Sequence, residues 1–385
     1  MKKFVELIQR VYTERYQTVI DRILKSKMPV AYLSIRTLSN AIEIVEDLRK
    51  QGMNITNLVT TTVPPEDLKV DFNLVQLADF NKIQPRPEYI FTVDRTWDVT
   101  NARVAKKTAP DCKIISMVLL YNDHTNIYET FMSHLTDLQG VYESLIDETS
   151  RRTFCGYWLG NICNRFDELV YSDMPHYFCE GFIPPKGGVV IEGGSYDGGS
   201  ATIFAEMGYK VYGFELEKGN YEKIKPIARE KNFVIENLGL GAAKGELKFT
   251  PTPNGPGSYI NAAGSEVAKI TTIDAYVREN ALPRVDFIKL DVEGSELNVL
   301  RGATVTINRF KPILAISAYH KWDDFWVLMN FIKSVRPDYK FALRQFPENR
   351  EGIPSMFGAA SDDYLYDFGL EIDWRDFYEC VLFAR

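Results

Sequence analysis

The residues that most clearly point to chemistry lie in VVIEGGSYDGGSA, residues 189–201, where a short apolar run meets an acid and a cluster of glycines. The pattern is E-x-G-x-x-x-G, carried by Glu192, Gly194 and Gly198. Nicotinamide dinucleotides are typically bound by G-x-G-x-x-G, which no register of residues 193–199 supplies. A bare backbone with a nearby acid instead suits a ligand that carries a carboxylate, an amine and a sulfonium, and S-adenosylmethionine is such a ligand.

A second acid, Glu215, ends the next apolar segment, KVYGFE at residues 210–215. In a strand–helix–strand layout, an acid about 20 residues beyond the glycine loop accepts hydrogen bonds from ribose hydroxyls. We therefore predict that Glu215 binds the ribose and that Glu192 lies near the charged methionine end of the cofactor, directly or through water. The simpler interpretation is a tight turn and a solvated strand end. The loop, the spacing and the acid together favour the cofactor.

Two further strand ends carry polar residues. DFIKLDVEG ends with Asp291 and Glu293, and PILAISAYH ends with His320. The carboxyl ends of strands in an open α/β sheet meet at one crevice, so these side chains are expected to share a site with the glycine loop. His320 is the candidate base for an acceptor hydroxyl, because the ordinary pKa of histidine is about 6.5. The alternative is a histidine that caps the next helix or hydrogen-bonds within the core.

The same strand ends also offer ligands for Mg²⁺, namely Asp291, Glu293, His320 and Asp324. However, Asp323 or Asp324 is equally well explained as the N-cap of the following helix, and Glu293 as an acid favoured at a helix start. These interpretations favour a site without metal ligands, and Mg²⁺ is kept as the alternative cofactor.

Strands and helices alternate from residue 188 onward, as a parallel sheet with helices on its faces requires. Strands are predicted at 188–192, 210–215, 233–240, 285–294 and 312–320, with a closing hairpin of 339–346 and 378–385. Helices are predicted at 198–208, 218–232, 270–280, 295–310 and 323–335, and a loop rich in glycine and proline at 251–264.

The first 120 residues show the same alternation, with strands predicted at 30–35, 55–62, 72–80, 89–94 and 112–120 and a helix at 38–52. Since no glycine follows the first strand, in SIRTLSNA, we predict a scaffold or substrate-holding domain and not a second nucleotide site. The predicted domains are an N-terminal α/β domain at 1–123, a helical connector at 124–180 and a cofactor domain at 181–385. The cofactor domain carries an insert at 347–377 between the hairpin strands.

The motifs VVIEGGSYDGGSA, VYGFE, FIKLDVEGSELNVLRGA and KPILAISAYHKWDD together resemble the FkbM-type S-adenosylmethionine-dependent methyltransferases, over about residues 176–346. The resemblance implies a Rossmann-like, seven-stranded sheet with a reversed last strand. It also implies methyl transfer to oxygen, commonly on sugars or natural products, with Asp291 beside the methionine moiety and the acceptor. Together with His320, the base proposed above, Asp291 is a candidate catalytic residue. The implied cofactor-binding residues are Glu192, Gly193, Gly194, Ser195, Gly198, Glu215 and Asp291.

Two features depart from that resemblance. The strand FVIENLGLG lacks a terminal aspartate for the adenine amine, so backbone near Gly239 and Leu240 is expected to meet it. The insert 347–377 is longer than a simple hairpin turn and is expected to form a lid or an acceptor-binding flap.

Composition excludes several classes of protein. The 385 residues include 45% hydrophobic ones, enough for packed cores, and the net charge of −7 argues against nucleic acid and for a small-molecule or sugar acceptor. No run approaches the roughly 20 apolar residues of a membrane span. Five cysteines without a CxxC pair argue against a disulfide framework and a structural zinc site, and favour the cytoplasm.

The leading hypothesis is thus an S-adenosylmethionine-dependent O-methyltransferase. Two alternatives are a non-catalytic scaffold that retains the cofactor fold and a nicotinamide-dependent oxidoreductase. The missing G-x-G-x-x-G disfavours the oxidoreductase, and the intact Glu192, Gly194, Gly198 and Glu215 argue against a decayed scaffold.

Overall fold

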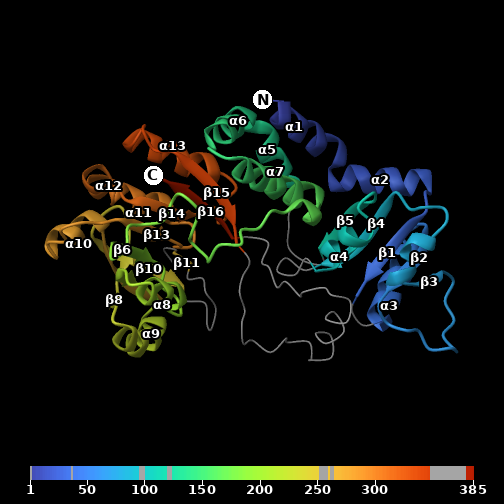
Figure 1. Ribbon diagram of the computed structural model, residues 1–385, viewed down its shortest axis with the longest axis horizontal. Helices are drawn as coiled ribbons and strands as arrows, with labels where there is room; N and C mark the ends of the chain where they lie inside the picture. The colour runs from blue at the N-terminus through green and yellow to red at the C-terminus, as the bar shows by residue number, and fades with distance from the viewer. Residues whose placement is uncertain are drawn as a thin grey trace. The chain divides into compact units, whose positions relative to one another are not determined.

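The computed structural model of the chain describes residues 2–35, 38–94, 100–118, 124–250, 259–260, 264–346 and 379–385 (Figure 1). The chain divides into two compact units. Among the described residues, the N-terminal unit takes those up to 134 and 151–171, and the C-terminal unit takes 135–150, 172–346 and 379–385. The segment 124–180, which we predict as one connector, is therefore divided between the units. The insert 347–377 lies outside the described residues.

The N-terminal unit contains a parallel five-stranded sheet in the order β3-β2-β1-β4-β5. Its strands are β1 (Val30–Ser34), β2 (Ile55–Thr60), β3 (Asn73–Gln76), β4 (Tyr89–Asp94) and β5 (Lys113–Val118). The predicted parallel α/β sheet is confirmed. The strand predicted at 72–80 is shorter, because the chain turns at Leu77 into the 3₁₀ helix η1 (Leu77–Lys82), which buries Leu77 and Phe80.

Successive residues of a strand point to opposite faces of the sheet. Buried clusters on both sides show that both faces of this sheet are covered. Tyr32 packs with Val45 in one buried cluster, and the adjacent Leu33 packs with Ala105 in another. The helices of the unit are α1 (Lys2–Glu14), α2 (Tyr16–Ser26), α3 (Leu38–Lys50), α4 (Thr100–Thr108), α5 (His124–Ser133), the greater part of α7 (Glu148–Cys163) and the short η2 (Phe166–Glu168).

The C-terminal unit contains a seven-stranded sheet in the order β15-β16-β14-β13-β6-β7-β8 (Figure 1). Its strands are β6 (Val189–Gly193), β7 (Lys210–Phe214), β8 (Val234–Glu236), β13 (Phe287–Leu290), β14 (Ile313–Ser317), β15 (Phe341–Gln345) and β16 (Cys380–Ala384). All neighbours are parallel except at β16, which is antiparallel to β14 and β15. The predicted Rossmann-like sheet with a reversed last strand is thus confirmed.

The helices of this unit are α6 (Leu135–Ser144), α8 (Gly199–Glu206), α9 (Lys218–Lys231), α10 (Ile273–Glu279), α11 (Glu296–Arg301), α12 (Thr304–Phe310) and α13 (Asp324–Val335). The single helix predicted at 295–310 is wrong. The Asp274 carboxylate accepts hydrogen bonds from the backbone N–H groups of Val305 and Thr306, so a new helix begins there. Gly302 allows the break, because a Cβ at this position would lie 2.1 Å from the Gly241 carbonyl oxygen.

A second, four-stranded sheet in the order β11-β10-β12-β9 is not evident from the sequence. Its strands are β9 (Gly239–Leu240), β10 (Gly245–Thr250), β11 (Tyr259–Ile260) and β12 (Glu266–Thr271). The strand predicted at 233–240 is split, because Asn237 donates side-chain hydrogen bonds to the carbonyls of Glu215 and Leu216 where the chain leaves β8. The remainder becomes β9 and pairs with β12.

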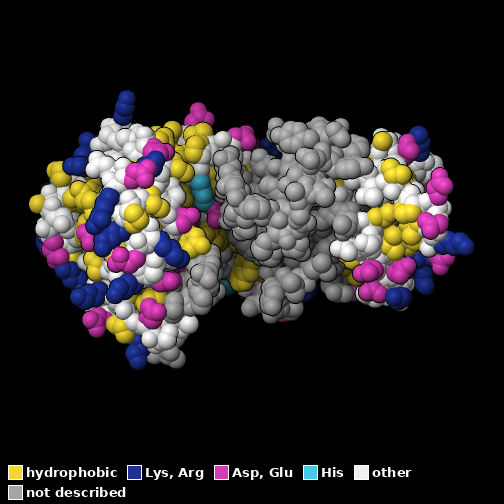
Figure 2. Space-filling model, turned by 90° about the horizontal axis from the view of Figure 1, so that it is seen from below, with side chains coloured by type: hydrophobic (Ala, Val, Ile, Leu, Met, Phe, Trp, Pro, Cys, Tyr) yellow, Lys and Arg dark blue, Asp and Glu magenta, His cyan; other side chains and the backbone are white. Residues whose placement is uncertain are grey.

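On the face shown in Figure 2, lysine and arginine side chains are intermixed with aspartates and glutamates over the described surface. All five cysteines are free thiols. Among the described helices, none has the length and apolar character that crossing a membrane would require.

Candidate active site

The glycine loop after β6 passes directly over the end of β13. Gly194 has a φ of 78°, and a Cβ at this position would lie 1.7 Å from the Asp291 carbonyl oxygen. The backbone N–H groups of Gly194 and Ser195 donate to the Phe214 carbonyl at the end of β7. Gly198, with a φ of 81°, precedes α8. Glycine is therefore required at 194, where the residue after β13 leaves no space for a Cβ, and favoured at 198, where a Cβ would lie 3.0 Å from Ile224 Cγ2 of α9.

Glu192 supports this loop from the interior. Its side chain is fully buried and accepts hydrogen bonds from the hydroxyls of Ser195 (2.8 Å) and Ser200. The buried Lys289 ammonium lies 3.8 Å from Glu192 and donates to the Gly194 carbonyl at 2.6 Å. The Glu192 side chain is fully buried in this structure, and its predicted place near the methionine end of the cofactor, directly or through water, stays a prediction.

Glu215 lies at the opposite side of the loop, at the end of β7. Oε2 accepts a hydrogen bond from the Tyr196 N–H and Oε1 accepts one from the Glu217 N–H, both at 2.8 Å. Burial raises the pKa of Glu215, and the two N–H donors partly oppose that shift. Each carboxylate oxygen has two acceptor sites, so one remains on each for a ligand hydroxyl.

Gly239 and Leu240 belong to β9, where they pair with Ile270 and Thr271. A Cβ on Gly239 would lie 2.5 Å from Ile270 Cδ1, so this glycine serves packing between the strands. Leu240 approaches the glycine loop, since its Cδ1 lies 3.1 Å from the position of a Cβ on Gly193. Their predicted contact with adenine stays a prediction.

Asp291 follows β13 and is surrounded by hydrogen-bond donors. The Tyr177 hydroxyl donates to Oδ2 at 2.8 Å, and the Tyr319 hydroxyl donates to Oδ1 at 3.2 Å. Burial disfavours the ionised form, but the positive charges of Lys289 and His320 outweigh it and hold the pKa of Asp291 below its ordinary value. The Tyr177 pKa is raised well above its ordinary value by burial and by the Asp291 charge, so Tyr177 remains a donor.

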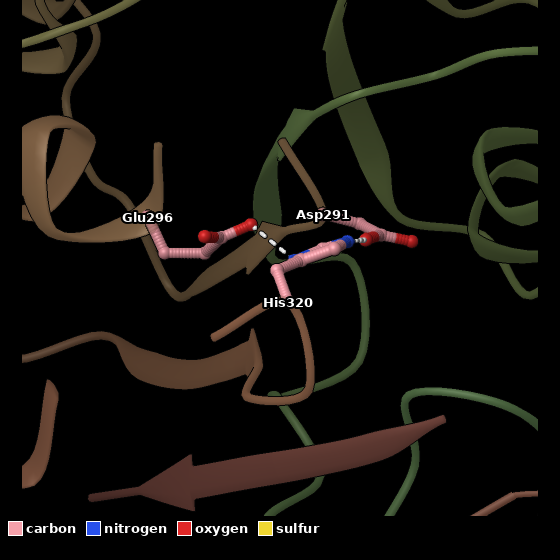
Figure 3. A group of neighbouring side chains, drawn as sticks. All are labelled: Asp291, Glu296 and His320. Carbon is pink, nitrogen blue, oxygen red and sulfur yellow. Dashed lines mark ion pairs between the residues drawn. The ribbon is translucent and has the colours of Figure 1, made fainter. Parts of the chain in front are cut away.

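The His320 imidazole lies between two carboxylates (Figure 3): Nδ1 is 3.0 Å from Glu296 Oε1, and Nε2 is 3.4 Å from Asp291 Oδ1. Nε2 is also 3.4 Å from Glu293 Oε2. Burial alone would lower the pKa of His320, but Glu296 and then the other two carboxylates raise it to about 9. Asp291, Glu293 and Glu296 lie within six residues of one another and at least 24 residues before His320, and they move its pKa away from the ordinary value near 6.5 on which the prediction of a base rests.

The four residues considered for Mg²⁺ are not all brought together. One ligand atom each from Asp291, Glu296 and His320 lie within 4.8 Å of one another. Asp324 instead accepts a hydrogen bond from the Lys321 N–H at 2.8 Å, just before α13. Burial and the nearby Glu296 charge raise the pKa of Asp324 to about 7. Asp323 occupies the predicted N-cap position of α13 but makes no side-chain cap hydrogen bond, and Asp324 is the first residue of the helix.

Several site residues are missed by sequence reasoning. Lys289 is a charge inside an otherwise apolar strand, which is the signal that could have identified it. Glu296 resembles an ordinary helix-start acid, and Tyr177 lies 114 residues before its partner Asp291. His176, considered as a crevice residue, stacks on Tyr177 with 3.9 Å between ring centroids, and its Nε2 lies 2.8 Å from Glu379 Oε2.

Comparisons with known proteins agree with this geometry. Residues 192–349 match the family model described as the methyltransferase FkbM domain. The hexuronic acid methyltransferase AglP of Haloferax volcanii is 31% identical over 99 residues, which cover 24% of this chain and 41% of that protein. The match therefore spans less than half of that relative's length.

Among solved structures, the methyltransferase FkbM of Methylobacillus flagellatus KT aligns with a TM-score of 0.59 at 15% identity, covering 100% of this chain and 98% of that chain. This likeness concerns the fold. The sequence match concerns one part of the chain. Over residues 192–349, the chain contains a methyltransferase FkbM domain.

Proposed function

We propose that this chain transfers the methyl group of S-adenosylmethionine to a hydroxyl oxygen of a sugar. The observation that carries the proposal is the Glu215 carboxylate, buried at the end of β7 beside the bare loop at Gly194. A carboxylate fixed by two backbone N–H groups is oriented before a ligand arrives, which favours the pairing of its free acceptor sites with two ribose hydroxyls.

The residues around this carboxylate fit the proposed cofactor. The glycines of the loop let its backbone lie against neighbouring elements, and the hydrogen bond from the Ser195 hydroxyl to Glu192 keeps the loop in position. Asp291 supplies an ionised carboxylate at the adjoining strand end, close to the expected location of a cationic sulfonium. When bound, S-adenosylmethionine supplies an electrophilic methyl group on positively charged sulfur.

The residues of the chain then act by positioning and by proton transfer. The acceptor oxygen forms a bond to the methyl carbon while the carbon–sulfur bond breaks and its electron pair stays on sulfur. We assign acceptance of the hydroxyl proton to Asp291 Oδ2, which receives one hydrogen bond from Tyr177 and has a second acceptor site. His320 is then the cationic neighbour of Asp291, a revision of its role as base.

The proposal of a sugar acceptor draws on the similarity of residues within this domain to a protein named hexuronic acid methyltransferase. A sugar offers several hydroxyls of similar reactivity. Selection among them requires that the acceptor be held close to the methyl group in one orientation, since a small displacement costs much of the rate.

The experiment has two arms. Calorimetric titration with S-adenosylhomocysteine measures cofactor binding, and transfer of a radiolabelled methyl group from S-adenosylmethionine is measured with oligosaccharides that contain or lack a hexuronic acid. We expect saturable binding and label in the sugar fraction. Absence of S-adenosylhomocysteine binding would overturn the cofactor assignment. Binding with label in none of the sugars would reject the sugar acceptor alone.

A further inference from the structure

We propose that His320, Asp291 and Glu293 bind one divalent transition-metal ion, with Nε2, Oδ1 and Oε2 as the ligand atoms and Glu296 as the residue that orients the imidazole. This ligand set keeps three of the four residues that the sequence suggests for Mg²⁺ and omits Asp324. It also differs from the group drawn in Figure 3, because Glu296 takes a supporting role. The binding inference does not depend on methyl transfer.

The first step concerns the two ring nitrogens of His320. One imidazole gives an ion only one nitrogen, and the other nitrogen of a metal-binding histidine usually donates to a carboxylate or a carbonyl. Here Nδ1 lies 3.0 Å from Glu296 Oε1, and Nε2 lies 3.4 Å from each of two carboxylate oxygens, of Asp291 and Glu293. Nε2 therefore faces the Asp291 and Glu293 carboxylates, and Nδ1 faces Glu296.

The second step concerns Glu296, which is 1% exposed. Its Oε1 already accepts hydrogen bonds from the N–H groups of Val292 and Gly294 in addition to its contact with His320. Its Oε2 is buried, and no hydrogen-bond partner for it exists among the described residues. A carboxylate with this many donors on one oxygen is fixed in place, as a supporting residue for a ligand histidine is expected to be.

The third step concerns distances. Two ligand atoms about 2.1 Å from one ion are separated by roughly 3.0–3.4 Å for octahedral to tetrahedral angles. The two Nε2–oxygen separations of 3.4 Å lie at the upper end of that range. They are also long for hydrogen bonds. The spacing therefore suits atoms that share an ion.

The fourth step concerns charge and access. Three carboxylates surround the His320 imidazole, and an ion that binds here takes the place of the proton on Nε2. The side chains of Asp291 and Glu293 are 21% and 36% exposed, which leaves room for water or substrate oxygen on an ion. Both hydroxyls that donate to Asp291 would support it as a ligand.

The ligand types indicate which ion. An imidazole nitrogen with two carboxylates suits Mn²⁺ or Zn²⁺ better than Mg²⁺, which prefers oxygen ligands and retains its waters. An ion held here would lie beside the acceptor hydroxyl and lower its pKa. That consequence, unlike the binding itself, rests on the proposed function.

The test is a titration of the full chain with Mn²⁺, with free Mn²⁺ followed by electron paramagnetic resonance. Wild-type chain should bind one ion, and Glu293→Gln and His320→Ala should each weaken binding by more than 10-fold. Glu296→Gln should weaken it by about 10-fold or more, since it removes an orienting charge. The matched control is Glu279→Gln, an exposed carboxylate on α10 that pairs with Lys244. It should bind Mn²⁺ as wild type does.

Pulsed electron paramagnetic resonance spectra of the wild-type chain with Mn²⁺ should show coupling to an imidazole nitrogen. This measurement uses the wild-type chain only, so it does not depend on whether a variant folds. Absence of this coupling, or equal Mn²⁺ affinity in wild type and Glu293→Gln, would overturn the inference. Mg²⁺ binding as tight as Mn²⁺ binding would do so too. S-adenosylhomocysteine titration of the same samples distinguishes this failure from failure of the proposed function.

Discussion

Glu192 and Lys289 are direct register partners on the neighbouring parallel strands β6 and β13, and both side chains are buried, with 3.8 Å between Oε1 and Nζ. Each holds a different part of the glycine loop: Glu192 accepts from the Ser195 hydroxyl, and Lys289 donates to the Gly194 carbonyl. The pair thus couples the interior of the sheet to the loop proposed to contact the cofactor.

Removal of one partner of this ion pair should lower the stability of the fold. We expect Lys289→Met to lower the free energy of unfolding by about 3–5 kcal/mol, because it leaves the Glu192 charge buried without its counterion. Chemical denaturation of single variants and of the double variant Glu192→Leu/Lys289→Met measures this. The double variant should be clearly more stable than Lys289→Met alone. Equal or lower stability of the double variant would show that the two charges are not coupled.

Gly194→Ala should destabilise the loop by far more than the free-energy cost of the left-handed backbone conformation alone. A Cβ would lie 1.7 Å from the Asp291 carbonyl, so the loop must move away from β13. The matched control is Gly208→Ala. Gly208 has a similar φ of 87°, but no atom lies within 4 Å of the position that a Cβ would take, so its substitution should cost only the left-handed strain of about 1–2 kcal/mol. We expect S-adenosylhomocysteine binding to be lost in Gly194→Ala and retained in Gly208→Ala, as measured by calorimetry. Full retention in Gly194→Ala would contradict a fixed loop.

Glu215→Gln should weaken S-adenosylhomocysteine binding by roughly 10-fold or more, since hydrogen bonds to a charged acceptor contribute about 1.5–3 kcal/mol. Glu230→Gln, on α9 and paired with Lys231, is the control and should bind normally. An unchanged dissociation constant for Glu215→Gln would remove its assignment to the ribose.

Binding should also depend on pH through Glu215. Burial raises its pKa, so the ionised form that accepts ribose hydroxyls is lost at a higher pH than for an ordinary glutamate. Affinity should therefore be constant near neutral pH and fall as the pH decreases through that raised pKa. Calorimetry over a pH series, with Glu215→Gln in parallel, measures this. The variant should lack the decrease, and the same decrease in both would assign it to another group.

Tyr177→Phe should lower the turnover number by about 10-fold and change cofactor affinity little, because it removes a 2.8 Å hydrogen bond to Asp291 without touching the loop. The control is Tyr276→Phe, which removes a comparable hydroxyl bond to Glu236 at 3.0 Å. Steady-state kinetics with the sugar that accepts the labelled methyl group provides the readout. If both variants lose activity equally, the effect of Tyr177 is general destabilisation.

Some predictions followed from local pattern alone. Apolar strands that alternate with helices predicted the parallel strands of both α/β sheets, since the period of the hydrophobic residues indicates which faces are buried. The glycine loop at 193–199 and Glu215 were recognisable as candidates because their pattern lies within one short strand–helix–strand segment. The reversed strand β16 also agreed with the prediction from resemblance.

Other features required contacts between distant residues. The helix break at Gly302 and the sheet β9–β12 depend on close approach to Gly241 and on strand pairing, which no local period encodes. The pKa of His320 is the clearest case. Its residue type suggests a neutral base, and the fold surrounds it with Glu296, Asp291 and Glu293.

By itself, the sequence determined the class of fold, the position of the loop and the identity of the acid beyond it, because these are properties of short segments. The tertiary structure decided which charges are paired, buried or left in excess. Electrostatic energy depends on distance and solvent exclusion between side chains, and the joining of Tyr177, Lys289, Asp291 and His320 in one site is a result of the packing of β6, β13 and β14.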